Sequence, residues 1–189
     1  MKKLLIILAS VVAIFAIIFA FSGKSGAMNN NKTLVAYFSA TGNTAAVADR
    51  LATAIGADLF AIEPVSIYTM DDLNYKNKES RASIEMADRA SRPEIASHVE
   101  NMEQYDVVFV GFPIWWGREP SIIDTFVESY DFAGKTIVPF ATSGSTPTTD
   151  GAAESIRPLV PNANVLVGKR FSTDVSGDEL KTWADEWVK

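Results

Sequence analysis

Residues 33–44 read TLVAYFSATGNT and join an apolar segment to a turn rich in hydroxyl groups. The apolar part is predicted to be a β-strand, and a helix is expected to begin near Ala45. The first backbone N–H groups of a helix have no partner inside it, and the helix dipole favours negative charge at that end. The side chains of Ser39, Thr41 and Thr44 can each add a hydroxyl donor. The stretch therefore predicts an anion-binding site between a strand and a helix.

The turn at residues 39–44 contains no lysine or arginine. A nucleoside triphosphate site normally brings a lysine toward the outer phosphates, whereas neutral donors alone can hold a terminal monophosphate. The composition of the turn therefore favours a ligand with a single terminal phosphate.

Residues 1–21 have the pattern of a targeting segment. Two lysines precede an apolar run, Leu4 to Phe21, that is interrupted only by Ser10. This length lies between a signal peptide's apolar core and a short membrane-spanning helix, so a cleaved signal peptide and a membrane anchor both stay open. Residues 22–32 are small and polar, as expected of a linker. Because the positive charges come first, the protein is expected outside the cytoplasm, anchored or secreted, unless translation starts at Met28 and gives a cytoplasmic form.

Residues 33–189 have the size of one domain. The chain has 17 basic and 23 acidic residues, and four of the basic ones precede residue 33, so the domain carries a net charge of −10. This charge disfavours nucleic acid and suits a redox partner protein with a basic surface, although solubility alone also explains it. The chain has no cysteine and one histidine, His98, so neither thiol catalysis nor a metal site is predicted.

Apolar segments alternate with helical patterns along the whole domain. Strands are predicted at 33–38, 58–62, 105–112, 135–140 and 164–167, and helices at 45–55, within 71–90, and at 121–130, 151–159 and 177–187. Val107 to Val110 is apolar on both faces, which is typical of a parallel strand covered by helices on each side. The pattern predicts an α/β fold with a doubly wound parallel sheet.

Ligands of such folds bind outside the carboxyl ends of the strands. The third strand is followed by residues 111–120, GFPIWWGREP, and the fourth by residues 141–149, ATSGSTPTT. Neighbouring residues in an extended loop point in different directions, so at least one of the two tryptophans is expected to cover a ligand or groove. Stacking on a flat heteroaromatic ring is the natural use of such a side chain.

These three loops resemble those of the flavodoxin family. The resemblance implies a five-stranded parallel sheet of order 2-1-3-4-5 and a non-covalently bound flavin mononucleotide (FMN), in a short-chain form. It implies that the phosphate is held by Ser39, Ala40, Thr41, Gly42, Asn43 and Thr44. It also implies that the isoalloxazine ring is flanked by Pro113, Ile114, Trp115, Trp116 and Gly117, and that its pyrimidine edge meets Thr142, Ser143, Gly144 and Ser145.

Flavodoxins turn a backbone carbonyl near a glycine toward the flavin when it is reduced, and Gly117 is the residue here whose conformational freedom would permit this. The acidic domain and the apolar rings over the flavin should also disfavour the anionic reduced form and lower the second redox potential.

Three functions follow from the resemblance. The first is an exported or membrane-anchored electron carrier that passes low-potential electrons to protein partners. The second is an FMN-dependent NAD(P)H oxidoreductase acting on quinones or similar small acceptors, in which Arg118 and the long segment 66–103 would help to admit substrate. The third is a flavin-binding protein without redox turnover. No catalytic side chain is assigned, and segment 66–103 is either a cover for the flavin or a surface helix with solvated charges.

Overall fold

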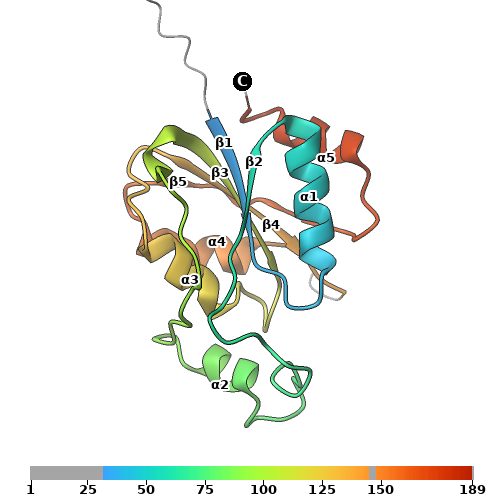
Figure 1. Ribbon diagram of the computed structural model, residues 1–189, viewed down its shortest axis with the longest axis vertical. Helices are drawn as coiled ribbons and strands as arrows, with labels where there is room; N and C mark the ends of the chain where they lie inside the picture. Colours follow the sequence, from blue (N-terminus) through green and yellow to red (C-terminus); the bar gives the residue numbers. More distant parts are fainter. Residues whose placement is uncertain (1–31, 145–147, 189) are drawn as a thin grey trace, which may run out of the picture.

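The computed structural model describes residues 32–144 and 148–188 (Figure 1). Its strands are β1 (Lys32–Tyr37), β2 (Asp58–Ala61), β3 (Tyr105–Pro113), β4 (Thr136–Thr142), β5 (Asn164–Val165) and β6 (Lys169–Phe171). Its α-helices are α1 (Asn43–Ile55), α2 (Arg81–Ala87), α3 (Ser121–Glu128), α4 (Asp150–Ile156) and α5 (Gly177–Ala184), and two short 3-10 helices are η1 (Met102–Gln104) and η2 (Arg157–Leu159).

The strands form one parallel sheet in the order β2-β1-β3-β4-β5, as the resemblance predicts. Successive residues of β1 alternate between the two faces, because Leu34 and Ala36 join one apolar cluster and Val35 joins the other. Helices α3 and α4 pack in the first cluster, and α1 and α5 pack in the second. The result is the doubly wound, three-layered α/β fold that the sequence predicts.

The fifth position of the sheet differs from the prediction of a single strand at 164–167. Strand β5 pairs with Thr136 and Ile137 at the start of β4, and β6 pairs with residues 140–142 at its end. Gly168 separates them and has a φ of +79°. Residues other than glycine adopt this left-handed conformation only at a cost in conformational energy. The expected fifth strand is therefore two short strands, and the second was not predicted.

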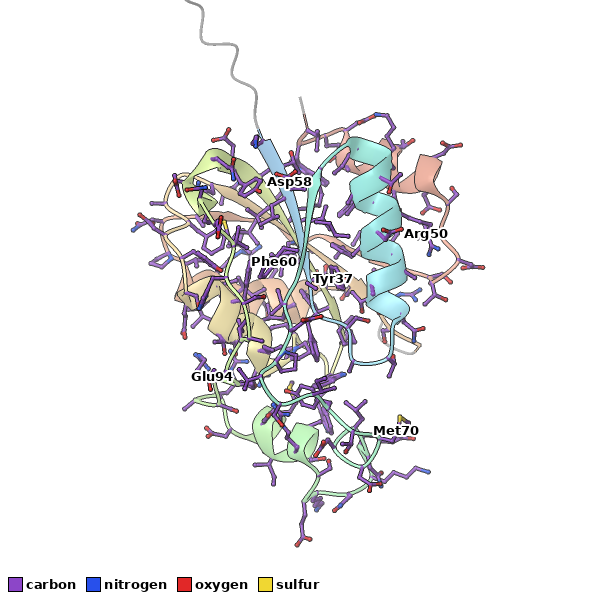
Figure 2. All side chains as sticks on the ribbon, in the orientation of Figure 1. Tyr37, Arg50, Asp58, Phe60, Met70 and Glu94 are labelled. Atoms are coloured by element: carbon purple, nitrogen blue, oxygen red, sulfur yellow. The ribbon has the colours of Figure 1, made fainter. Side chains whose placement is uncertain are left out.

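The segment between β2 and β3 extends beyond the carboxyl end of the sheet, with α2 at its tip (Figure 1). Figure 2 shows Met70 in this segment, at the opposite end of the molecule from Asp58, which begins β2. An antiparallel bridge between Pro64 and Ile95 joins the two arms of the segment. The hydroxyl of Ser121 in α3 donates a 3.1 Å hydrogen bond to the carbonyl of Glu85 and ties the segment to the domain, and Met86 of α2 is buried. The segment therefore stands next to the loops that the sequence predicts to bind the ligand.

The predicted targeting segment 1–21 lies outside the described residues, as do Met28 and all of the linker except Lys32. Across residues 32–144 and 148–188, none of the helices has both the length and the apolar character needed to cross a membrane.

Candidate functional site

The predicted anion site lies where β1 leads into α1. Helix α1 begins at Asn43, and its N-cap Gly42 has a φ of +86° and provides no side-chain cap. The first N–H groups of α1 are therefore free to meet a ligand. The hydroxyl oxygen of Ser39 is buried and has no hydrogen-bond partner among the described residues. A buried hydroxyl without a partner is costly, so the turn has the chemistry of a site that a bound anion completes.

Thr44 has a second role that the sequence did not indicate. Its buried hydroxyl lies 2.9 Å from the hydroxyl of Thr142, at the end of β4. This hydrogen bond ties the start of α1 to the loop after β4. It holds two of the three predicted loops together, while the backbone N–H of Thr44 stays in the first turn of α1.

The loop after β3 folds as a two-residue hairpin. Trp115 and Arg118 exchange backbone hydrogen bonds of 2.9 and 3.1 Å, and Trp116 and Gly117 between them have φ values of +48° and +85°. Two positive φ values at the centre of a two-residue hairpin are typical of a type I′ turn. A tryptophan in the left-handed region is unusual and points to function, because the conformation is strained for a bulky side chain.

The two tryptophans point to different environments, as the sequence predicts. Trp115 is half-buried and packs edge-on against Phe38 and Tyr68, with ring centroids 5.6 and 5.4 Å away. Trp116 leaves 55% of its surface exposed. Trp115 therefore fixes the hairpin on the domain, and Trp116 is the ring left available at the surface.

A buried ionic cluster supports the hairpin from behind. Glu119 and Asp124 are both fully buried, and Asp124 lies 3.5 to 3.7 Å from the guanidinium groups of Arg89, Arg92 and Arg118. Within the described part of the chain, neither carboxylate oxygen of Asp124 accepts a hydrogen bond from a nitrogen or hydroxyl. Burial first, and then the nearby charge of Glu119, raise the pKa of Asp124 to about 7, although Arg89 and Arg118 oppose the shift.

Asp124→Asn is expected to flatten the pH dependence of stability. The carboxyl of Asp124 titrates near 3.8 when unfolded and near 7 when folded, so the folded state holds the extra proton between these values. Stability should therefore fall by more than about 1 kcal/mol as the pH rises through this window. Urea unfolding at pH 5 and pH 8 measures the change, and Asp106→Asn on the exposed side of β3 is the control. Equal pH dependence in all three proteins would contradict the assignment.

Two hollows open at the carboxyl end of the sheet. The polar hollow, of about 500 Å³, is lined by Thr41, Asn43, Pro113, Ile114, Trp115, Thr142, Ser143, Gly144, Arg170, Phe171, Ser172 and Thr173. The apolar hollow, of about 470 Å³, is lined by Ala40, Thr41, Leu73, Tyr75, Ala82, Pro113, Ile114, Trp115 and Trp116. They share Thr41 and residues 113–115, so they lie side by side across the loop after β1 and the loop after β3.

The structure brings the three predicted loops together around these hollows. Ser39, Gly42 and Thr44 belong to the turn before α1 but line neither hollow, and Gly117 also lines neither. The carbonyl oxygen of Gly117 faces α4, where a Cβ added at Gly151 would lie 2.4 Å from it. Ser145 lies outside the described residues.

The sequence analysis missed the contribution of residues 170–173, which follow the unpredicted β6. Arg170 is the single charged residue among those lining the polar hollow, and it donates a 2.9 Å hydrogen bond to the carbonyl of Ser143. Its Nε is buried without a hydrogen-bond partner in the described part of the chain. No local pattern marks Arg170, because its placement depends on the pairing of β6 with β4.

The fold and the three loops agree with the comparison to known families. The family model described as flavodoxin matches residues 32–187. The chain belongs to the flavodoxin family. No curated protein sequence matches it.

Solved structures agree with this membership. A candidate flavoprotein from Bacteroides eggerthii is 45% identical, with a TM-score of 0.78, and the match covers 83% of this chain and 98% of that one. One from Bacteroides uniformis is 44% identical, with a TM-score of 0.77 and coverage of 82% and 99%. A Lactobacillus acidophilus flavoprotein solved with FMN is 24% identical, with a TM-score of 0.65 and coverage of 84% and 99%, and shows the common fold.

The flavodoxin family implies FMN as the cofactor, and the residues present fit it. The N–H groups at the start of α1 and the unpartnered hydroxyl of Ser39 suit its phosphate. Apolar and aromatic side chains of residues 113–116 suit a flat ring, and the loop after β4 offers polar groups at its edge. The described residues contain no group of three or more histidine, cysteine, aspartate or glutamate side chains that could hold a metal ion.

Arg170→Gln is expected to weaken FMN binding by roughly tenfold, because a hydrogen bond to a charged group contributes about 1.5 kcal/mol or more. Flavin fluorescence quenching during titration measures the dissociation constant, and riboflavin, which lacks the phosphate, is the matched ligand. A loss confined to FMN would place the guanidinium against the phosphate, whereas an equal loss with riboflavin would place it against the ring. Unchanged binding of both ligands would remove Arg170 from the site.

Proposed function

We propose that this protein is an FMN-dependent electron carrier outside the cytoplasm that passes low-potential electrons to protein partners. As a member of the flavodoxin family it is an FMN-binding redox protein in general terms. One observation carries the FMN-binding part of this proposal. The turn with the uncapped start of α1 and the unpartnered, buried Ser39 hydroxyl adjoins the same two hollows as the Trp115–Arg118 hairpin.

The exposed apolar side chains near the site support a protein partner. Val65, Ile67, Met70 and Ile84 all belong to the segment after β2, and each is more than half exposed. Exposed apolar side chains that come from one segment are the raw material of an interaction site. The apolar run at residues 4–21 supports the placement outside the cytoplasm.

FMN supplies one- and two-electron redox chemistry when bound. The chain's own residues bind and orient it. The turn at residues 39–44 would hold the phosphate through neutral donors, and Trp115, fixed by Phe38 and Tyr68, would set one wall for the ring. Trp116 would shield part of the ring from water while leaving an edge open to a partner.

A second candidate function is an FMN-dependent NAD(P)H oxidoreductase that reduces quinones or similar acceptors. The apolar hollow favours it, because Leu73, Tyr75 and Ala82 extend the hollow beyond the loops predicted to hold FMN, and an enzyme needs such room for a substrate. All three residues come from segment 66–103, which the sequence left open as either a cover for the flavin or a surface helix.

An anaerobic visible spectrum of residues 28–189 loaded with FMN, before and after adding NADPH or NADH, separates the two functions. The family model matches residues 32–187, and the matches cover 98% and 99% of the Bacteroides chains, so we expect the domain to fold on its own. A stable flavin band that resists both nucleotides but responds to photoreduction would support the carrier. Rapid bleaching would support the oxidoreductase, and failure to retain any FMN would refute both.

Gly117→Ala is expected to shift at least one of the two one-electron potentials by about 50 mV. The left-handed conformation, with φ of +85°, costs alanine about 1 to 2 kcal/mol, and any turning of this peptide on reduction changes that cost. Spectroelectrochemistry measures both potentials. Gly56→Ala, at a left-handed position in the cap of α1 that is likewise free of close contacts, is the control. Unchanged potentials would show that this peptide does not respond to the flavin.

A further inference from the structure

We propose that a hollow at the amino end of the sheet binds a small zwitterion, a molecule with one carboxylate, one ammonium group and a short apolar frame. The hollow opens between the chain that leads into β3 and the loop that joins α3 to β4. Its volume of about 510 Å³ is within the usual range for small-molecule sites. Free α-amino acids with aliphatic side chains are the simplest ligands of this class.

This amino-end hollow is separate from the flavin site. Within residues 32–144 and 148–188, it shares no lining residue with the polar or the apolar hollow. Strand β3 runs from Tyr105 at this end to Pro113 at the flavin site, and its nine residues span roughly 30 Å. The start of β1 pairs beside Tyr105, at the end of the molecule opposite α2 (Figure 1). Binding here therefore does not depend on the proposed function.

Lys135 supplies the positive charge of the amino-end hollow. The residue lines the hollow, yet only 9% of its surface is exposed. Its ammonium donates hydrogen bonds of 2.6 and 3.2 Å to the carbonyls of Tyr105 and Glu103, and in the described part of the chain it forms no ion pair. A buried lysine normally has a counter-charge, and the third N–H of this one has no acceptor there. A ligand carboxylate would supply both.

Tyr130 adds a second donor to the same hollow. Its hydroxyl oxygen accepts a 2.7 Å hydrogen bond from the backbone N–H of Val99, which fixes the hydroxyl in place. The hydroxyl proton meets no acceptor among the residues that the structure describes, so it is available to a ligand. The Tyr130 ring packs edge-on against Phe126 and Phe132, with ring centroids 5.3 and 6.2 Å away. This donor is therefore positioned before a ligand arrives, which lowers the entropic cost of binding.

Two carboxylates require the ligand to carry a positive charge as well. Glu103 and Asp131 line the same hollow, and both are exposed. Two carboxylates against the one ammonium of Lys135 leave an excess of negative charge, which would repel a simple anion. One oxygen of Asp131 accepts a 2.9 Å hydrogen bond from the N–H of Ala133, whereas the side chain of Glu103 has no polar partner among the described residues. An ammonium group on the ligand would pair with Glu103 and balance the charge.

The remaining wall of the hollow suits an aliphatic frame. Val99, Met102 and Ala133 contribute apolar surface to it. Met102 is buried in the apolar cluster that also holds α3 and α4, and Val99 packs against that cluster. The wall is therefore rigid and short, and L-leucine is a suitable probe because it combines both charges with a branched aliphatic side chain.

Calorimetric titration of the full-length protein, purified in detergent, with L-leucine at neutral pH tests this inference. We expect one leucine to bind per chain and two analogues to bind at least about tenfold more weakly. Leucinamide lacks the carboxylate that would meet Lys135, and 4-methylpentanoate lacks the ammonium group that would meet Glu103. No saturable binding of leucine at concentrations up to about 10 mM would overturn the inference, as would equal affinity for leucine and either analogue.

Glu103→Gln tests the exposed side of the hollow without disturbing the fold, because the Glu103 side chain has no polar partner among the described residues. It should weaken leucine binding by about tenfold while leaving the weaker binding of 4-methylpentanoate unchanged. Glu100→Gln is the matched control, because Glu100 is exposed in the same segment and does not line the hollow. Equal leucine affinities of the two variants would contradict the zwitterion.

Lys135→Met tests the buried side, since methionine keeps an unbranched apolar stem but has no ammonium. Leucine binding should be lost, whereas Lys32→Met should bind leucine normally, because Lys32 begins β1 at the same end of the sheet and does not line the hollow. Circular dichroism reports whether each variant folds. Normal leucine binding by folded Lys135→Met would reduce Lys135 to a cap for two carbonyls and overturn the site. If Lys135→Met does not fold, the comparison of leucine with leucinamide decides.

Discussion

Gly168→Ala is expected to destabilise the domain by at least about 3 kcal/mol. The φ of Gly168 is +79°, and a Cβ at this position would lie 1.9 Å from the carbonyl oxygen of Pro139 in β4. The left-handed conformation alone costs alanine about 1 to 2 kcal/mol, and the overlap with a central strand adds a further 1 to 3 kcal/mol. Urea unfolding followed by circular dichroism measures the loss.

Gly134→Ala is the matched control. Gly134 has a φ of +75°, but a Cβ there would meet no atom within 4 Å, so only the conformational cost of about 1 kcal/mol applies. The difference between the two variants isolates the contact with Pro139. Equal destabilisation would show that the sheet moves easily at this point.

This contact also connects the fold with the site. Gly168 lets the chain step from β5 to β6, and β6 carries Arg170 to the polar hollow. Gly168→Ala should therefore weaken FMN binding even where the folded fraction is high, whereas Gly134→Ala should not.

The contrast between β1 and β6 shows what the sequence alone can predict. Strand β1 and the turn after it combine a buried apolar run, a glycine and several hydroxyls within one short stretch, so local chemistry specifies both the element and its ligand. Strand β6 has three residues, Lys169, Arg170 and Phe171, and two of them are charged. It forms a strand because it pairs with the free edge of β4, which lies about 30 residues earlier in the sequence, so no local pattern predicts it.

The ionic cluster was missed for a related reason. Glu119 and Asp124 look like surface residues in the sequence, since carboxylates are seldom fully buried without a partner. Their partners, Arg89 and Arg92, come from the segment before β3, so only the folded chain brings them together. The two tryptophans were easier, because adjacent residues in a loop must point in different directions, and Trp115 and Trp116 do so.

Glu119→Ala is expected to destabilise the domain by about 3 to 5 kcal/mol. Glu119 is fully buried, accepts a 2.6 Å hydrogen bond from Ser155 of α4, and lies 3.3 Å from both Arg89 and Arg118. Its removal leaves two guanidinium groups short of a buried counter-charge, which is the costly way to break an ion pair. The residue therefore joins α4 and the segment before β3 to the hairpin that carries Trp116.

Glu128→Ala provides the comparison, because Glu128 pairs with Arg92 of the same cluster through hydrogen bonds of 2.6 and 2.9 Å but is 39% exposed. Exposed pairs contribute about 1 kcal/mol or less, so its loss should be small. Glu119→Gln, which keeps an acceptor for Ser155, should fall between the two. Because the Trp115–Arg118 hairpin ends directly before Glu119, FMN affinity should drop in Glu119→Ala and stay unchanged in Glu128→Ala. If both alanine variants lost equal stability, the cluster would be a set of surface pairs rather than the support of the flavin loop.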